Sequence, residues 1–399
     1  MPDTYLGESV KKLGFGLMRL PRVEGGQDFD LEQIKKMVDH FLANGYTYFD
    51  TAYVYGGSEE ATREALVKRH PRDKYTIASK LNLNAALGGG MGFGGPPQPA
   101  AAPPSREEAQ KKMLDQFETT LSRLGTDYLD FYLLHGLGGA TIKTADDVDA
   151  WGFVRSLKEQ GRIRHYGLSF HGTPEELDGV FTAHPDAEFV QLQINYLDWE
   201  DERVQSGKCY AVARKHNKPV TVMEPIKGGQ LANENAVFAK HFKTFDADTS
   251  AASWALRFVA DLPGLVAILS GMSTYEQLVD NVNTFNGLKP LSDADRKAIA
   301  DARNVIASVP RVPCTACNYC KDCPQKINIA QMFNLYNDFL VYGEINERMY
   351  GMMTGAPSPF NDRTGKPSDC VSCKSCENEC PQHIEISSLM EKIAAVAPK

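Results

Sequence analysis

What the 399-residue sequence lacks excludes several classes of protein. It has no run of about 18 apolar residues, so we expect no segment that spans a membrane. The N-terminal stretch MPDTYLGESVKKLGFG has neither the apolar core nor the cleavage site of a secretory signal, and we therefore predict a cytoplasmic protein. Basic residues are fewer than acidic ones, 43 against 51, and the net charge of −8 argues against binding to nucleic acid.

Cysteine is almost missing from most of the chain and is concentrated near its end. Cys209 stands alone, and the other eight cysteines lie between Cys314 and Cys380. In a secreted domain eight cysteines would indicate disulfides, but in a cytoplasmic chain they favour bound metal.

Over the first 290 residues, β-rich runs alternate with segments of helical periodicity. In LEQIKKMVDHFLANG, for example, the apolar residues Ile34, Met37, Val38, Phe41 and Leu42 form one stripe. Eight parallel strands joined by helices close into a (β/α)8 barrel. A doubly wound open sheet is the alternative, but the G-x-G-x-x-G turn that normally follows its first strand is absent. The expected strands are 13–20, 46–52, 75–80, 128–135, 164–170, 189–195, 219–225 and 265–271.

Functional side chains of such a barrel gather at the carboxyl ends of its strands. Polar residues stand at or near these ends, and Tyr55 follows the first of them in the stretch FDTAYVYGGSE. Each could be an ordinary loop entry, but together they indicate a site. The set is Asp50, Lys80, His135, Ser169, Gln193, Glu224 and Ser270.

Between residues 10 and 290 the sequence resembles the aldo-keto reductases. The motifs that carry the resemblance are LGFGLMRL, FDTAYVYGGSE, SK at 79–80, YLDFYLLH, YGLSF, QINY at 193–196 and GMSTYEQLVDN at 271–281. The resemblance implies hydride transfer between a nicotinamide cofactor and a small-molecule carbonyl or alcohol substrate. It also implies a catalytic tetrad of Asp50, Tyr55, Lys80 and His135.

The chemistry of these residue types agrees with that assignment. Reduction of a carbonyl needs a proton donor, and a free tyrosine has a pKa near ~10, too high for easy exchange at neutral pH. A nearby ammonium group favours phenolate, and a carboxylate holds the ammonium group in place. We therefore expect Tyr55 to be the acid, with Lys80 lowering its pKa and Asp50 anchoring Lys80. His135 would orient the carbonyl oxygen or share the proton relay.

The same resemblance implies a set of cofactor contacts. Ser169 and Gln193 would bind the carboxamide of the nicotinamide, and Lys227 in the EPIKGG loop would meet a phosphate. Met223 replaces an aromatic ring found in many members, and Gly271 and Gln277 stand where many have a basic residue, so both NADP and NAD remain open. The complete set is Met18, Ser169, Gln193, Glu224, Lys227, Gly271, Ser273, Gln277 and Asn281.

A stretch rich in glycine, proline and alanine, residues 81–105, follows the third expected strand. It is either a disordered surface insertion or a lid over the carboxyl ends of the strands.

The eight C-terminal cysteines form two runs, CTACNYCKDCP and CVSCKSCENECP. The second has the C-x₂-C-x₂-C-x₃-C-P spacing of bacterial ferredoxins, and the first is one residue shorter before its last cysteine. Two Cys₄ zinc sites are the alternative. The third cysteine of each run and the proline after the fourth favour two 4Fe–4S clusters.

Ferredoxin clusters take their fourth ligand from the other run. One cluster would therefore bind Cys314, Cys317, Cys320 and Cys380, and the other Cys370, Cys373, Cys376 and Cys323. Residues 327–353 between the runs read as one helix. We predict a barrel over 1–290, a helical connector over 291–312 and a small, mainly α-helical ferredoxin-like iron–sulfur domain over 313–399. The whole chain resembles a subfamily of aldo-keto reductases that carries such a tail.

Three functions compete at this point. The first is an oxidoreductase whose clusters relay single electrons to or from a redox partner, with a flavin or another converter between two-electron and one-electron chemistry. The second is an ordinary carbonyl reductase whose clusters only brace the tail. The third is a non-enzymatic barrel that senses redox state or binds a partner, and the complete tetrad argues against it.

Overall fold

The computed structural model describes residues 4–6, 8–88, 104–357 and 361–398. These residues form two compact units. The first contains residues 1–229 and 252–293, and the second contains residues 230–251 and 294–399. Residues 230–251 thus belong to the second unit, although they occur in the chain between parts of the first. The division of the sequence at residues 290 and 312 stays a prediction.

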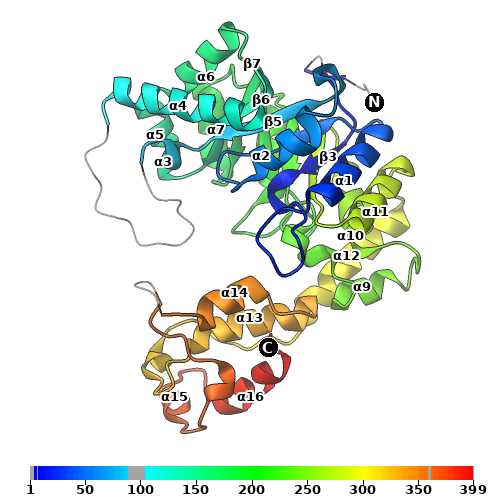
Figure 1. Cartoon of the computed structure of the whole chain (residues 1–399). Helices are drawn as coiled ribbons and strands as arrows, with labels where there is room; N and C mark the ends of the chain where they lie inside the picture. The colour runs from blue at the N-terminus through cyan, green and yellow to red at the C-terminus, as the bar shows by residue number, and fades with distance from the viewer. Residues whose placement is uncertain (1–3, 7, 89–103, 358–360, 399) are drawn as a thin grey trace. The chain divides into compact units, whose positions relative to one another are not determined.

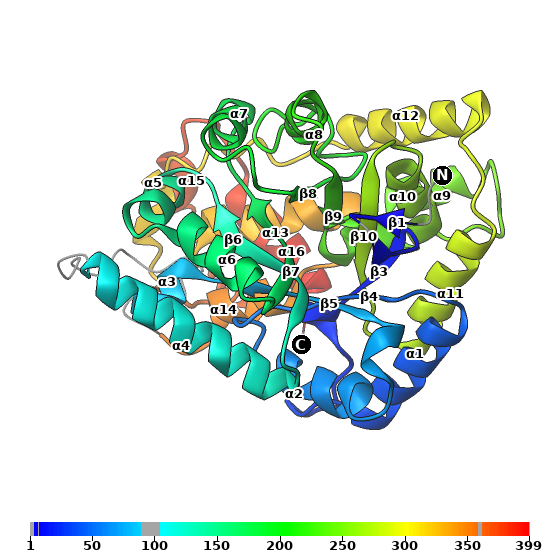
Figure 2. The same ribbon diagram turned by 90° about the horizontal axis from the view of Figure 1, so that it is seen from above.

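The first unit is the predicted barrel (Figures 1 and 2). Eight parallel strands close in the order β10-β3-β4-β5-β6-β7-β8-β9. In Figure 2 helices such as α1, α4 and α11 lie outside the strands. The strands are β3 (Leu13–Gly16), β4 (Tyr48–Asp50), β5 (Thr76–Leu81), β6 (Leu129–Leu137), β7 (Ile163–Phe170), β8 (Phe189–Gln193), β9 (Val220–Met223) and β10 (Leu265–Gly271). A short antiparallel pair, β1 (Thr4–Tyr5) and β2 (Glu8–Ser9), precedes them.

The first strand ends earlier than predicted. Residues 17–20 are as apolar as a strand, but the chain turns at Gly16 into a 3-10 turn, η1 (Leu17–Arg19), in which Leu17 is buried. The strand register then sets the neighbours of the site. Gly16 pairs with Asp50, and Asp50 pairs with Ala78, so the ends of β3, β4 and β5 lie together.

Side chains fill the interior of the barrel. Tyr48, Phe131 and Phe189 are fully buried there, with ring centroids 5.1 Å apart for Tyr48–Phe131 and 5.5 Å apart for Phe131–Phe189. A barrel of eight strands is just wide enough to be packed in this way, so its site must lie at the ends of the strands.

Helix α1 shows why the outer layer forms. Its residues Ile34, Met37, Val38 and Phe41 are buried, as their spacing predicts, and Asp30 caps the helix by accepting from the Gln33 amide. The first unit contains α1 (Leu31–Ala43), α2 (Ser58–Thr62), η2 (Arg63–Val67), η3 (Arg72–Lys74), α3 (Leu83–Ala86), α4 (Arg106–Leu124), α5 (Ala140–Asp147), α6 (Ala150–Glu159), α7 (Pro174–Ala183), α8 (Ser206–Lys215), α10 (Ala251–Ala260) and α11 (Tyr275–Asn286). Residues 89–103 of the predicted lid or insertion lie outside the described residues.

The second unit is mainly helical and has its own apolar core. Ile327, Met332, Ile386, Met390 and Ile393 are buried in it. Its elements are α9 (Val237–Phe242), α12 (Asp293–Ser308), η5 (Tyr319–Asp322), α13 (Ile329–Tyr342), α14 (Glu347–Thr354), η6 (Pro367–Asp369), α15 (Ser375–Asn378) and α16 (Ile386–Val396).

The single helix predicted over 327–353 is wrong, because the chain breaks into α13 and α14. Gly343 ends α13 in the left-handed conformation, with φ of 80°, and its amide donates to the carbonyl of Phe339. This is the usual way in which a glycine ends a helix. No helix among the described residues is both long enough and apolar enough to cross a membrane.

Candidate active site and cysteine cavities

A buried ion pair forms the base of the barrel site. Lys80 on β5 donates from Nζ to Oδ1 of Asp50 at 2.6 Å and to the carbonyl of Thr51 at 2.7 Å. Lys80 is 0% exposed and Asp50 is 3% exposed. A buried charge is costly unless it is paired and hydrogen-bonded, so these contacts explain how a lysine is tolerated there. Burial alone would lower the pKa of Lys80, but Asp50 and Tyr55 together raise it, and the amine stays charged.

Tyr55 lies on the turn between β4 and α2. Its amide donates to the carbonyl of Ala52, and its own carbonyl accepts from the Ser58 amide. Gly57, in the left-handed conformation, stands at the N-cap of α2. The turn brings the Tyr55 ring beside Lys80, whose Nζ lies 5.0 Å from the ring centroid.

The expected net lowering of the Tyr55 pKa is wrong for this state. Burial raises the pKa of Tyr55, and this effect exceeds the opposite effect of Lys80, which has the predicted direction. Tyr55 therefore keeps its proton at neutral pH, as a proton donor must.

His135 completes the group of four. It lies near the end of β6, and its ring centroid is 6.0 Å from that of Tyr55, with an angle of 82° between the rings. Burial, with smaller effects from Lys80 and His171, lowers the pKa of His135 to about 3. A neutral imidazole can orient a carbonyl oxygen, whereas Tyr55 retains the proton. The structure thus brings all four predicted tetrad residues together.

Asp198 is a residue that the sequence reasoning missed. It is 2% exposed and accepts three side-chain hydrogen bonds. Gln193 Nε2 donates to Oδ2 at 2.8 Å, Asn195 Nδ2 donates to Oδ2 at 2.7 Å, and Lys227 Nζ donates to Oδ1 at 2.5 Å. Asp198 therefore links two of the predicted cofactor residues. The signal in the sequence was an asparagine and an aspartate directly after an apolar strand.

The other predicted cofactor residues have local partners. Ser169 accepts from the Gly136 amide at 2.7 Å, and buried Asn281 donates to Ser270 at 2.9 Å. The Ser273 amide donates to the Gln277 side chain at 2.8 Å.

Three further predicted residues lie on the connections after strands. Met18 in η1 is 52% exposed. Gly271 ends β10, and Glu224 follows β9 in the left-handed conformation with φ of 52°.

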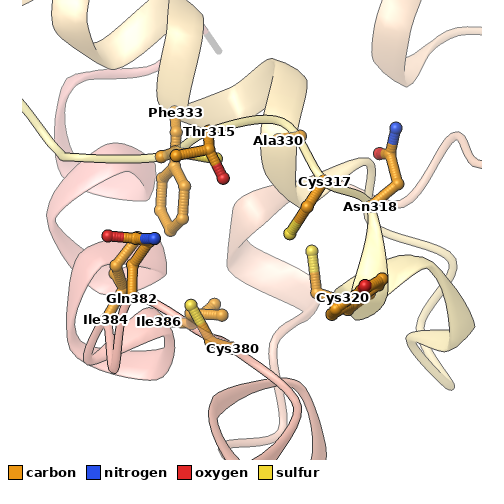
Figure 3. A pocket seen from close by; sticks show the side chains of 12 residues that line it. Thr315, Cys317, Asn318, Cys320, Ala330, Phe333, Cys380, Gln382, Ile384 and Ile386 are labelled. Atoms are coloured by element: carbon orange, nitrogen blue, oxygen red, sulfur yellow. The ribbon is translucent and has the colours of Figure 1, made fainter.

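The second unit contains two cavities lined by cysteine. The first is lined by Cys314, Cys317, Cys320 and Cys380, and Figure 3 shows the side chains of Cys317, Cys320 and Cys380 around it. The second is lined by Cys323, Cys370, Cys373 and Cys376, and Cys320 of the first set lines it as well. These are the two sets that the crossed ferredoxin pattern groups together.

The two cysteine runs repeat the same backbone conformation. In each run the residue before the second cysteine, the residue after it and the third residue after the last cysteine have positive φ. The pairs are Ala316 and Ser372 (54° and 52°), Asn318 and Lys374 (60° and 61°), and Lys326 and His383 (54° and 50°). The sequence contains a signal for this repeat, CPQKINI against CPQHIEI, which the spacing of the cysteines alone did not reveal.

Such left-handed residues turn successive backbone amides toward one point, and concavities of this kind hold anions and iron–sulfur groups. The Ala316 amide already donates to Sγ of Cys314 at 3.5 Å. Within the described part of the chain, no three His, Cys, Asp or Glu side chains form a group that could hold one metal ion.

Known proteins resemble the part of the chain that contains the barrel. A model of the Aldo/keto reductase family matches residues 12–304. The chain is 28% identical to "Aldo-keto reductase str7" of Strobilurus tenacellus over 59% of its own length and 64% of that protein. It is 28% identical to "Probable aldo-keto reductase 1" of Glycine max over 48% of its own length and 50% of that protein. The chain therefore spans less than two thirds of either relative.

A solved structure of similar fold is the aldo-keto reductase from Klebsiella pneumoniae in complex with NADPH. It has a TM-score of 0.57 and 21% identity, and the match covers 74% of this chain and 92% of that one. At this identity the likeness concerns the fold.

Proposed function

The chain belongs to the aldo/keto reductase family, and from this premise we propose that it is an oxidoreductase acting at Asp50, Tyr55, Lys80 and His135. Its substrate is a small carbonyl compound or the corresponding alcohol. The observation that carries the proposal is the buried Lys80–Asp50 pair beside a protonated tyrosine and a neutral histidine. A nicotinamide cofactor, NADP or NAD, supplies the hydride when it is bound.

Each side chain then has one task. Tyr55 donates its hydroxyl proton to the oxygen of the carbonyl as the carbon gains hydride, so the product is the alcohol. Lys80 stabilises the resulting phenolate, and Asp50 keeps Lys80 in position and charged. His135, which is neutral, holds the carbonyl oxygen by a hydrogen bond. Gln193 and Ser169 would position the carboxamide of the bound nicotinamide. Asp198 holds the side chain of Gln193 in place by a hydrogen bond.

Replacement of Tyr55 by Phe tests the proposal. We expect the turnover of carbonyl substrates to fall by about 10²–10⁴-fold, because general acid catalysis contributes this much. Dinucleotide binding, measured by fluorescence titration, should stay within about twofold of the wild type. Near-normal turnover would show that Tyr55 is not the acid.

We also propose that the eight cysteines hold two 4Fe–4S clusters with crossed ligands. Two cavities that together contain all eight cysteines, the repeated left-handed residues and the amide contact to Cys314 support this proposal. Protein purified without oxygen should contain about eight irons and eight acid-labile sulfides. Tightly bound zinc without sulfide would support the alternative instead.

Paired variants test the crossing. Cys314→Ser with Cys317→Ser removes the first cluster and should leave about four irons. In that background, Cys323→Ser should disturb the remaining cluster, whereas Cys380→Ser should not. The reverse result would show that each run holds its own cluster.

Finally, we propose that the clusters relay single electrons. One metal site would be enough to brace a small domain, whereas the proposed ligand sets would form two. Tyr319, Cys320 and Ile386 line both cavities. A flavin, or a substrate that passes through a radical, would connect this chemistry to hydride transfer, and a one-electron protein or small molecule would be the partner.

Anaerobic reduction with NADH or NADPH, with and without substrate, should produce paramagnetic signals from the clusters. Clusters that never change oxidation state, together with a Cys373→Ser variant that stays folded and fully active, would show that they are structural.

A further inference from the structure

The mouth of the barrel contains a cation that the proposed chemistry does not yet use. Arg19 lies on η1, directly after β3, and its side chain is exposed. No ion pair is formed by its guanidinium group within the described residues. Its charge also acts on Glu224: burial raises the pKa of Glu224, and Lys227 and, to a smaller extent, Arg19 lower it.

Arg19 is held across the end of β10. Its carbonyl accepts from Oγ of Ser273 at 2.8 Å, which ties η1 to the segment after β10. Its side-chain carbons would lie 3.4–3.6 Å from a Cβ atom at Gly271, so the arginine lies against a glycine that leaves room for it.

The guanidinium end reaches the loop after β9. Nη2 of Arg19 would be 3.2 Å from a Cβ atom at Gly228, which has φ of 64° and adjoins Lys227. A side chain at Gly228 would be strained and would crowd the guanidinium group. The group therefore lies against bare backbone, where a ligand oxygen can approach it.

Lys227 is less suited to bind an anion, because its charge is already used. Its Nζ is paired at 2.5 Å with Asp198, which is buried and accepts two further hydrogen bonds. If Lys227 left this pair, Asp198 would be buried with one fewer partner, which is costly. Gly271 and Gln277 carry no charge, and the Gln277 side chain is engaged with the Ser273 amide.

We infer that Arg19, rather than Lys227, is the residue that receives the pyrophosphate of the nicotinamide dinucleotide. A guanidinium group donates two parallel hydrogen bonds to phosphate oxygens, which suits this task. The inference rests on the dinucleotide-dependent function proposed above. NAD and NADP both contain this pyrophosphate. Arg19 should therefore increase the affinity for both dinucleotides without selecting between them.

Binding titrations test the inference without an activity assay. Wild type, Arg19→Ala, Arg19→Lys, Lys227→Gln and the control Arg22→Ala are titrated with NADH, NADPH and ADP-ribose. Arg22 lies three residues further along, is exposed and stacks on Phe29, so its removal controls for the loss of one positive charge.

We expect Arg19→Ala to weaken all three ligands by the same factor, about ten- to a hundredfold, as for a charged hydrogen bond. Arg19→Lys should recover part of this loss, because it restores the charge without the fork. Lys227→Gln, which can still donate to Asp198, and Arg22→Ala should each change binding less than about threefold.

Three results would overturn the inference. Unchanged binding in Arg19→Ala would show that the guanidinium group does not contact the dinucleotide. A loss for NADPH alone would place Arg19 at the 2′-phosphate, and a larger loss in Lys227→Gln would restore Lys227 as the phosphate partner. If the wild type binds neither NADH nor NADPH, the proposed function fails as well.

Discussion

The two units of this chain build their sites by different physical means. In the barrel, strand register places Asp50 beside Gly16 of β3 and Ala78 of β5, and close packing buries Lys80 completely. In the second unit, the cysteines of the two runs lie on connections shaped by left-handed residues, except Cys320 in η5 and Cys376 in α15, and most of them are only partly buried. The barrel site should therefore keep its structure without a bound ligand, whereas the structure around the cysteine cavities should depend on a bound metal group.

Removal of the proposed clusters should have the largest effect. Binding of structural metal contributes on the order of 10 kcal/mol to the folding of small domains. Chelation under oxidising conditions should therefore abolish the protection of amide hydrogens in α13 and α16, while β5 and β6 keep theirs. Hydrogen exchange with mass spectrometry measures both. If α13 and α16 stay protected, the apolar core of the second unit is sufficient alone, and the comparison between the units fails.

Replacement of Lys80 by Met should produce the largest effect within the barrel. It leaves Asp50 buried without its cation, so we expect the free energy of unfolding to fall by about 3–5 kcal/mol. The double variant Lys80→Met with Asp50→Asn removes the unpaired charge and should recover part of the loss. Urea unfolding of the three proteins gives these values. A loss below about 1 kcal/mol would mean that the packing of the barrel tolerates the isolated carboxylate.

His135 should make the barrel less stable in acid. Its pKa is lowered to about 3 in the folded state, while the unfolded chain binds the proton near pH ~6.5. Stability should therefore be complete above about pH 6.5 and fall as the pH decreases toward 3, by about 1.4 kcal/mol at pH ~5.5. His135→Gln removes this dependence, which thermal unfolding at several pH values can show. Equal slopes for the two proteins would contradict the assignment.

Loss of a helix cap should have the smallest effect. Ser105 and Glu108 form a reciprocal capping box at the start of α4. Ser105→Ala should lower the free energy of unfolding by about 1 kcal/mol, with no change in dinucleotide affinity or iron content. Thr173→Ala at the equivalent box of α7 is the matched control, and a similar loss is expected there.

The sequence was sufficient for the barrel because its signals are local. Each strand is a short apolar run, and polar residues stand at or near the ends of these runs, so Asp50, Lys80 and His135 could be chosen as candidates before their distances were known. The first strand was predicted too long because Leu17 is as apolar as a strand residue but packs from a turn. An apolar run in the sequence indicates that a segment is buried more directly than it indicates which backbone conformation the segment adopts.

The features that escaped prediction depend on contacts between distant segments. Asp198 pairs with Lys227, which is 29 residues away in the sequence, and Arg19 lies against Gly228 and Gly271. The net raising of the Tyr55 pKa depends on how deeply the folded barrel buries that ring. The cysteine sets, in contrast, were predicted from a known spacing, and the cavities group the same residues.

The discontinuous second unit has a consequence for synthesis of the protein on the ribosome. Residues 230–251 belong to this unit, and Phe238 on α9 packs against Tyr342 on α13, with ring centroids 6.3 Å apart. At about 5–20 residues per second, α13 follows α9 out of the ribosome roughly 5–20 s later. During that interval Phe238 lacks its contact with Tyr342, so this part of the apolar side of α9 is covered only after α13 has been made.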